Sequence, residues 1–216
     1  MIIQLKGSNR AEVPEVFEAM FRLREDVFAN RLKWVSPSPD GLETDEFDTD
    51  DTYYFAYIGS DDRMDACWRV VPTEQPYMLE KVFPILLDGN AAPKVSNAWE
   101  ISRLAVSGRA LEASGLGLMN RITQELVCSI YEFGPTVGMT EAVAVCEVSV
   151  ARLLSRLGCQ TLWTSRAHRI GRTITIAAIY DISATVHEIV KTRCQLHCPV
   201  LVDINAGQPG NIRRTA

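Results

Sequence analysis

The chain has 216 residues, of which 47% are hydrophobic and 23% charged, and its formal net charge at pH 7 is −5. This length and composition are typical of a globular protein and fit one α/β domain with a sizeable core. Because non-specific nucleic-acid binding requires a basic face, the negative charge argues against a nucleic-acid partner.

The sequence predicts a cytoplasmic protein without membrane insertion. The apolar run in MIIQLKGSNR is too short for a signal peptide, and the positive charges follow it. The sequence contains no stretch of about 18 apolar residues. Most of the six cysteines lie in apolar runs, which predicts reduced core thiols. We expect no metal site, because the candidate cluster Cys194-Gln-Leu-His197-Cys198 offers three ligands and no second half.

Residues 12–32 have the spacing of an amphipathic helix. Phe17, Phe21, Arg24 and Phe28 fall on one face of that helix. Arg24 therefore lies inside an apolar stripe. Two interpretations are open: its stem covers core while its head reaches water, or the whole side chain points inward to carboxylates.

Residues 35–51 combine prolines, a glycine and acidic residues, which predicts a long loop. Asp45 and Asp48 flank Phe47 in this loop. We expect the other acids of the segment to be solvated, namely Glu43, Glu46, Asp50 and Asp51.

The rest of the chain alternates between strand-like and helical patterns. YYFAYI (53–58) and MDACWRVV (64–71) predict a hairpin, and a short helix or aromatic loop over 77–88 carries Phe83. The later elements are strands over 99–106, 141–146, 159–165 and 173–182, and helices over 115–133, 149–158 (closed by Gly158) and 183–194.

This order fits a mixed α/β sheet sandwiched by helices. Neither an internal repeat nor a linker divides the sequence. We therefore expect one domain over residues 1–204 and a disordered tail over 205–216.

Charged and aromatic residues in the first half describe a partly enclosed site for a charged or zwitterionic ligand. They are Arg24, Phe28, Trp34, Asp45, Asp48, Arg69, Phe83, Glu100 and Arg103. In this series the chain resembles the acyl-homoserine-lactone synthases, the autoinducer synthases of the LuxI type, where the same residues recur in this order and at about this spacing. The resemblance covers about residues 1–185. It implies the GNAT-like acyltransferase fold, with a splayed central cleft, and a role in quorum sensing.

The resemblance also implies a reaction. The α-amine of S-adenosylmethionine attacks the carbonyl of an acyl thioester. The substrate carboxylate then attacks the γ-carbon, closes the lactone and expels methylthioadenosine. Both ligands are substrates, so we expect no cofactor. The amine has a pKa of about 7.7–8.0 and must lose a proton to a base. Glu100 is the candidate base, and its alternative role is that of a structural partner of Arg103 or Arg24.

The other site residues are expected to bind substrate. Arg24, Arg69 and Arg103 can pair with the substrate carboxylate or with Asp45 and Asp48. The candidate substrate-binding residues are Phe28, Trp34, Phe83, Ser102, Leu104, Val106, Val145 and Cys146. The acyl pocket is expected to be lined by residues from Leu104 to Val106, Val143 to Cys146 and Val150 to Leu154. Relatives that make 3-oxo products carry a threonine near the position of Cys146, so an unsubstituted, branched or aryl acyl group is expected here.

The resemblance implies that the acyl donor is acyl-CoA or acyl carrier protein. The sequence places Glu112-Ala-Ser-Gly115-Leu-Gly117 directly after a strand and at the start of a helix, which is a geometry that binds phosphate. This pattern resembles the coenzyme A loop of GNAT enzymes and favours acyl-CoA slightly. The alternative is a tight turn with a packing role.

One further expectation concerns the strand 99–106. Glu100 and Arg103 would face opposite sides of a regular strand. The family places both in one cleft, which requires a β-bulge near Ser102.

Two other functions remain open from the sequence. One is a GNAT N-acyltransferase that uses acetyl-CoA on another amine. The other is a non-catalytic GNAT-fold module that binds an effector.

Overall fold

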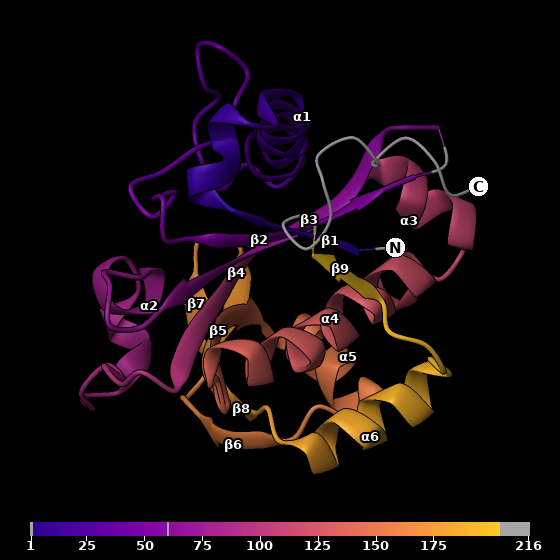
Figure 1. Ribbon diagram of the computed structural model, residues 1–216. Coiled ribbons are helices and arrows are strands. Elements are labelled where there is room, and N and C mark those ends of the chain that lie inside the picture. The colour runs from indigo at the N-terminus through magenta and orange to yellow at the C-terminus, as the bar shows by residue number, and fades with distance from the viewer. Residues whose placement is uncertain (1, 60, 204–216) are drawn as a thin grey trace. The chain divides into compact units, whose positions relative to one another are not determined.

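The computed structural model describes residues 2–59 and 61–203 (Figure 1). The described residues form two compact units. The first contains the described parts of 1–69, 103–129 and 200–216, and the second contains 70–102 and 130–199. The predicted single domain over 1–204 stays a prediction, and the predicted tail lies outside the described residues. Three elements contribute to both units: β3 (Met64–Pro72), β4 (Ala98–Val106) and α4 (Arg121–Val137).

The sheet of the first unit has the order β9-β1-β2-β3-β4. β1 (Ile2–Lys6) runs antiparallel to β2 (Tyr53–Ile58) and parallel to β9 (Leu201–Asp203). In β2 the residues Tyr54 and Ala56 point into one core, because alternate side chains of a strand share a face. The predicted hairpin of β2 and β3 is confirmed.

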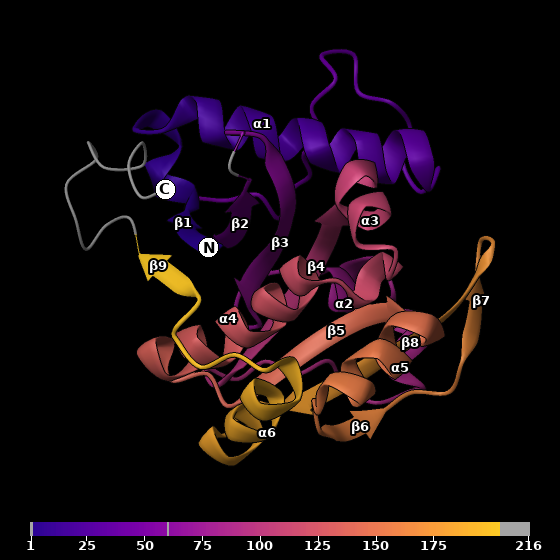
Figure 2. The ribbon, with the colours of Figure 1, turned by 90° about the vertical axis from the view of Figure 1, so that its right-hand side faces the viewer.

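A long helical segment covers this sheet. α1 (Pro14–Arg24) begins with a proline in its first turn, where the missing N–H costs no hydrogen bond. It continues as a π-helix, η2 (Glu25–Arg31). Figure 2 shows α1 lying across one side of β1, β2 and β3. Its apolar face packs on the sheet through Phe17, Met20 and Phe21. The helix predicted over 12–32 is confirmed, with a change of helical type in its last turns.

The second unit continues from β4 in the order β4-β5-β8-β6, and β7 also pairs with β8. β4 and β5 (Glu141–Glu147) are parallel, whereas β5 and β8 (Thr173–Asp181) are antiparallel. The remaining elements are α2 (Met78–Lys81), η3 (Pro84–Leu87), α5 (Val148–Leu157), β6 (Thr161–Thr164), β7 (His168–Ile170) and α6 (Ala184–Cys194).

The strands of the second unit are covered by helices. α5 lies over β5 and β8 (Figure 2). α2 and η3 contribute Leu79, Leu86 and Leu87 to a core shared with Val143 and Ala177 of the strands. Gly158 ends α5 at a φ of 99°, a conformation that a side chain would strain. The predicted mixed sheet flanked by helices is confirmed.

The elements that were not predicted include β1, the 3-10 helix η1 (Gly7–Ala11), α3 (Gly108–Ser114), β7 and β9. The helix predicted over 115–133 is wrong at its start. α3 occupies residues before it, η4 (Gly117–Met119) follows, and α4 begins at Arg121. Ser107 accepts the Ala110 N–H through its hydroxyl, so a serine N-cap starts a helix that has no apolar periodicity of its own.

The predicted irregularity in β4 is present. The pairing with β5 is regular from Ala98 to Ile101. Arg103, the residue after Ser102, has a φ of +56°, which is outside the extended region. A non-glycine residue in this conformation costs about 1–3 kcal/mol. The break therefore requires compensation from the contacts that Arg103 makes.

The thiols agree with the sequence interpretation. All six cysteines are free thiols, and four of them are buried: Cys67, Cys128, Cys159 and Cys194. Among the described residues, no helix is both long enough and apolar enough to cross a membrane.

Candidate active site

Three arginines and three carboxylates of the first unit form one ion-pair network, called here the charge network. Its members are Arg24, Arg69, Arg103, Glu43, Asp45 and Asp48. They come from α1, β3, β4 and the loop between η2 and β2. Three positive and three negative charges balance, which is what allows guanidinium groups to be buried.

Asp48 is the carboxylate with the most donors in the network. The Nη1 and Nη2 atoms of Arg24 donate to its two oxygens at 2.8 and 2.9 Å, a bidentate pair. Arg69 Nη1 donates to Oδ1 at 3.1 Å, and the Tyr54 hydroxyl donates to the same oxygen at 2.9 Å. The backbone N–H of Asp45 donates to Oδ2 at 2.8 Å. Asp48 thus ties the loop to α1, β2 and β3.

The network has an inner end and an outer end. The side chains of Arg24, Arg69 and Asp48 are at most 2% exposed. Arg103 is 11% exposed and Asp45 is 19% exposed, and they meet through Arg103 Nη2 at 2.7 Å. A ligand in solvent therefore meets Arg103 and Asp45 first, while the inner residues hold them in place.

The charges of the network stabilise one another. Burial alone raises the pKa of Asp48, but Arg24 and Arg69 outweigh it and hold that pKa well below its usual range. Burial alone lowers the pKa of Arg24, and the carboxylates of Asp48 and Glu43 outweigh it and raise that pKa above its usual value. Both groups are charged at neutral pH.

The depressed pKa of Asp48 predicts how stability depends on pH. A carboxyl whose pKa falls on folding stabilises the folded state above its unfolded pKa of about 3.9, and this contribution is lost as pH falls through the folded pKa. The free energy of unfolding of the wild type should therefore exceed that of Asp48→Asn at pH 7. Urea unfolding at pH 7, 5, 4 and 3 should show this difference shrinking at the acid end. A difference that stays constant down to pH 3 would contradict the ion pairing.

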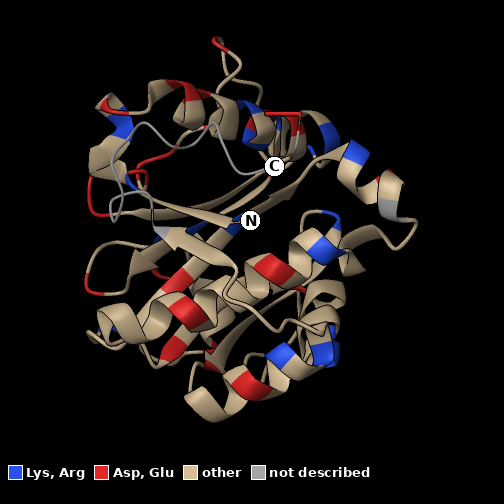
Figure 3. Cartoon of the chain, turned by 45° about the vertical axis from the view of Figure 1, so that its right-hand side comes forward, with Lys and Arg blue, Asp and Glu red and all other residues tan. Residues whose placement is uncertain are grey.

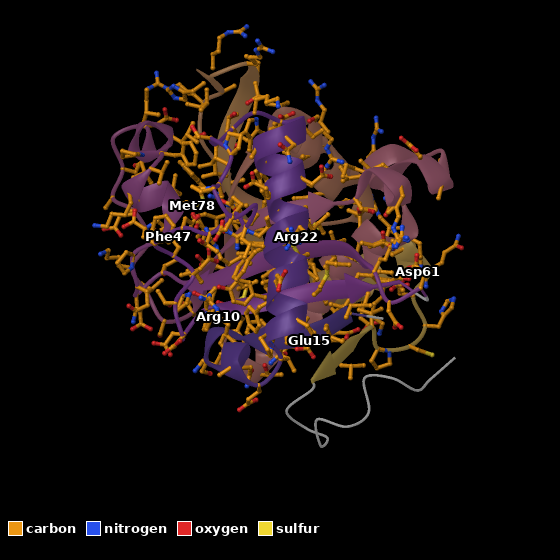
Figure 4. The ribbon with its side chains drawn as sticks, turned by 90° about the horizontal axis from the view of Figure 1, so that it is seen from above. Arg10, Glu15, Arg22, Phe47, Asp61 and Met78 are labelled. Atoms are coloured by element: carbon orange, nitrogen blue, oxygen red, sulfur yellow. The ribbon has the colours of Figure 1, made fainter. Side chains whose placement is uncertain are left out.

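Aromatic rings cover the network. The Arg103 guanidinium lies over the Phe28 ring at 5.3 Å, and Arg69 lies over Phe47 at 5.5 Å. Phe28 in turn contacts Trp34, with ring centroids 5.8 Å apart. Phe28 is buried, whereas Trp34 is 50% exposed. Trp34 thus offers an accessible indole surface. Figure 4 looks down on α1 and shows Phe47 and Arg10 on the same side of that helix.

Sequence reasoning was wrong about Glu43 and missed two further residues. Glu43 was expected to be solvated, but it is 3% exposed and pairs with Arg24 at 2.5 Å and with Arg103 at 2.9 Å. Acidic loops are usually solvated, and only the folded loop reveals which acid turns inward. Tyr54 and Phe47 also contact the network. The alternation of β2 is a sequence signal that Tyr54 points inward. The position of Phe47 between Asp45 and Asp48 is a sequence signal that its ring lies at the site. Glu46, Asp50 and Asp51 are exposed, as predicted.

Five predicted site residues belong to the second unit: Phe83, Glu100, Ser102, Val145 and Cys146. Glu100 is 1% exposed, and its two oxygens accept the backbone N–H groups of Met78 and Leu79 at 2.9 and 2.8 Å. Its alternative role, as a structural partner of Arg103 or Arg24, stays a prediction. Glu100 holds the first turn of α2, and Phe83 follows that helix and packs against the core of the second unit.

The predicted acyl-pocket residues are divided. Leu104 and Val106 belong to the first unit. Val145 and Cys146 belong to the second and point to opposite faces of β5, since neighbouring residues of a strand alternate. Val145 packs with the core under α2 and η3, whereas the Cys146 thiol is paired with Tyr180. That these residues line the acyl pocket stays a prediction.

The glycine segment differs from its predicted geometry. α3 separates it from β4, and Gly115 ends α3 with a φ of 63°. It therefore does not follow a strand directly, and α4 begins only at Arg121. Gly117 has a φ of 57°. Its carbonyl oxygen accepts a hydrogen bond from the side-chain amide of Asn120 at 2.9 Å. Asn120 also accepts the Thr123 N–H, which makes it the N-cap of α4.

A cavity of about 400 Å³ lies beside this segment within the first unit. Its lining residues are Asp65, Arg109, Ala110, Ala113, Asn120, Arg121 and Ile122. Asp65 pairs with Arg109 at 2.7 Å, and Arg121 pairs with Glu125 at 3.0 Å. In the view of Figure 3, acidic and basic residues are interspersed on α3 and α4. The lining of the cavity therefore carries both signs of charge beside apolar side chains.

The chain is similar to known proteins over most of its length. The family described as autoinducer synthase matches residues 9–190. An acyl-homoserine-lactone synthase of Aliivibrio fischeri is 32% identical over 186 residues, covering 85% of this chain and 95% of that one.

Two solved structures agree with the fold. The CoA-dependent acyl-homoserine lactone synthase BjaI, solved with SAM and isopentyl-CoA, aligns with a TM-score of 0.81 at 26% identity. That alignment covers 94% of this chain and 92% of the other. A putative N-acetyltransferase of Lactobacillus plantarum aligns with a TM-score of 0.55 at 16% identity over 85% of this chain and 98% of that one, which supports the GNAT-like fold alone. The chain belongs to the autoinducer synthase family, whose relatives reported above are acyl-homoserine-lactone synthases.

Proposed function

We propose that this protein is an acyl-homoserine-lactone synthase that makes a quorum-sensing autoinducer. It transfers an acyl group from a thioester to the α-amine of S-adenosylmethionine, and lactonisation releases methylthioadenosine. The observation that carries this proposal is the charge network with its aromatic cover. A generic amine acetyltransferase has no need of three arginines, two of them fully buried, that are neutralised by three carboxylates of one loop.

The outer end of the network suits a zwitterionic substrate. Arg103 presents a guanidinium that can pair with the substrate carboxylate, and Asp45 presents a carboxylate that can meet the substrate ammonium. Trp34 exposes an indole face, and a sulfonium is a cation that favours such a face. These contacts would hold the methionyl chain folded, so that its carboxylate attacks the γ-carbon in line.

Organic extraction of a culture that expresses the chain, followed by mass spectrometry, tests the proposed product. The homoserine-lactone fragment should appear, and the mass of its parent ion names the acyl group. The matched control is the same culture expressing Asp48→Ala. Cultures without the lactone fragment, despite soluble protein, would contradict the proposal.

We propose Glu100 as the group that accepts the amine proton, directly or through a water. Its carboxylate is buried and fixed by two N–H donors, so its position is defined. In Glu100→Gln the turnover number should fall about 10²–10⁴-fold near pH 7, the usual contribution of general base catalysis. The defect should lessen above about pH 8, where the substrate amine has lost its proton without help.

The alternative for Glu100 is a purely structural cap of α2. In that case Glu100→Gln lowers the free energy of unfolding by about 1–3 kcal/mol, because a buried N–H loses its acceptor. The turnover defect would then be the same at all pH values. A pH–rate profile and a urea unfolding curve of the same preparation separate the two roles.

We propose acyl-CoA, rather than acyl carrier protein, as the donor. The similarity to a synthase described as CoA-dependent supports this choice. So does the cavity beside Gly117, because its lining includes the guanidinium groups of Arg109 and Arg121. Gly115 and Gly117, whose backbone is open to solvent with no atom near their missing Cβ positions, are proposed to let the pyrophosphate approach.

A pair of substitutions tests the donor. Gly117 has a positive φ, which asparagine and aspartate tolerate better than other residues. Gly117→Asp adds a negative charge, and Gly117→Asn is its uncharged control. The charge should lower kcat/KM for an acyl-CoA about tenfold, or about 1.4 kcal/mol, and leave the same acyl group on carrier protein unaffected. A preference for carrier protein that neither substitution changes would return this segment to a packing role.

A further inference from the structure

The hydroxyl of Tyr54 is a member of the charge network that the proposed reaction does not yet use. Tyr54 lies on β2 with no exposed surface. Its hydroxyl donates to Asp48 Oδ1 at 2.9 Å. Burial, followed by the nearby Asp48 carboxylate, raises the pKa of Tyr54, so the hydroxyl stays protonated and remains a donor.

Asp48 is crowded with donors, and this makes its orientation sensitive to each one. A carboxylate offers about four acceptor positions. Oδ1 accepts from Arg24, Arg69 and Tyr54, and Oδ2 accepts from Arg24 and from the Asp45 backbone. Arg24 donates to the carboxylate from α1, Arg69 donates from β3, and the Asp45 backbone N–H donates from the loop. Tyr54 is the uncharged donor among the side chains and the one supplied by β2.

The ring of Tyr54 is held by aromatic contacts, so its hydroxyl has a defined position. It meets Phe17 edge-on at 5.5 Å and Phe21 edge-on at 6.3 Å. The Arg24 guanidinium lies over the same Phe21 ring at 5.2 Å. The Tyr54 ring and the Arg24 guanidinium, which both carry donors to Asp48, thus pack against the same side chain, Phe21.

Two sets of contacts connect the orientation of Asp48 to Asp45, at the outer end of the network. Arg69 Nη1 contacts Asp48 at 3.1 Å and Asp45 at 2.5 Å. The Asp48 Oδ2 atom also holds the backbone N–H of Asp45. A rotation of the Asp48 carboxylate would therefore displace both the side chain and the backbone of Asp45, and with them the partner of Arg103.

We propose that Tyr54 is a positioning residue for the synthase reaction, acting through Asp48 on Asp45 and Arg103. This inference rests on the proposed function. The hydroxyl holds the carboxylate in the rotation at which the outer ion pair faces the methionyl part of the substrate. Substrate binding also uses Trp34 and other contacts, whereas in-line attack needs the exact orientation. Loss of the hydroxyl should therefore affect turnover more than binding.

The test compares Tyr54→Phe with Tyr53→Phe. Both remove one hydroxyl from neighbouring positions of β2, and both keep the ring. Tyr53 points to the other face, where the Lys6 ammonium lies over its ring at 5.7 Å. Methylthioadenosine release is measured at saturating acyl thioester, with S-adenosylmethionine varied. We expect kcat of Tyr54→Phe to fall about tenfold while KM for S-adenosylmethionine changes less than twofold. Tyr53→Phe should match the wild type.

A second measurement asks whether the effect passes through Asp48. The thermal stabilities of the wild type, Tyr54→Phe, Asp48→Asn and the double variant form a double-mutant cycle. The hydroxyl should matter less when residue 48 is asparagine, so the two effects should not add.

Each outcome decides something. An inactive wild type would contradict the proposed function, whatever the variants do. An active wild type with unchanged kcat in Tyr54→Phe, an equal loss in Tyr53→Phe, or additive effects in the cycle would overturn the positioning role. So would a Tyr54→Phe protein that does not fold beside a folded Tyr53→Phe, because the hydroxyl would then be structural.

Discussion

Asp48→Ala is expected to abolish product formation while leaving a folded protein. The Asp48 side chain is 2% exposed and pairs with Arg24 and Arg69. Its loss strands two buried guanidinium groups, which costs about 3–5 kcal/mol. A domain has about 5–15 kcal/mol of stability, so the fold should survive with reduced stability. Product is measured by mass spectrometry, and stability by urea unfolding of the same preparation.

Asp50→Ala is the matched control for that experiment. Asp50 is an exposed acid of the same loop, two residues further on. A surface substitution of this kind usually changes stability by less than about 0.5 kcal/mol, and activity should be unchanged. Wild-type activity in Asp48→Ala would show that the role carried over from the family is wrong at this position.

Arg103→Ala should also abolish product, but by a different route. Arg103 is at the outer end of the network, where it pairs with Glu43 and Asp45. Its removal takes away the cation proposed to bind the substrate carboxylate. Arg103→Lys restores the charge without the fork of donors, so it should recover only part of the activity. Kinetics of methylthioadenosine release should show a raised KM for S-adenosylmethionine in the lysine variant.

Arg22→Ala is the control for the loss of an arginine. Arg22 is exposed and pairs with Glu18 one helical turn away, a contact of small energy. It should retain full activity. If Asp48→Ala and Arg103→Ala were both insoluble while Arg22→Ala was soluble, the network would be mainly structural.

The sequence predicted the parts of the fold that have strong local signals. The apolar stripe of α1, the alternation of β2 and the glycine after α5 each have a direct physical cause in a few residues. Short elements were missed because their cause is not local. β9 has three residues and exists by pairing with β1, and β7 exists by pairing with β8. α3 begins at a serine cap that apolar spacing does not reveal.

The sequence predicted which residues belong to the site better than it predicted which of them contact one another. Arg24 was left between a solvent-reaching and an inward side chain, and the structure shows the inward one. The pairing partner it needs, Glu43, comes from a loop whose acids look alike in sequence. A β-bulge near Ser102 was predicted because the family places Glu100 and Arg103 in one cleft. The backbone leaves the extended region at the next residue, Arg103. The partner of Glu100 was not predicted, because the N–H groups of α2 are backbone atoms and leave no mark in the sequence.

The most direct test of the account is the coupling between the two substrates. Purified protein is incubated with S-adenosylmethionine, with and without an acyl thioester, and methylthioadenosine is measured by chromatography. We predict release of methylthioadenosine only when the acyl thioester is present, in step with lactone formation. Turnover of acetyl-CoA with a generic amine, without use of S-adenosylmethionine, would contradict the account.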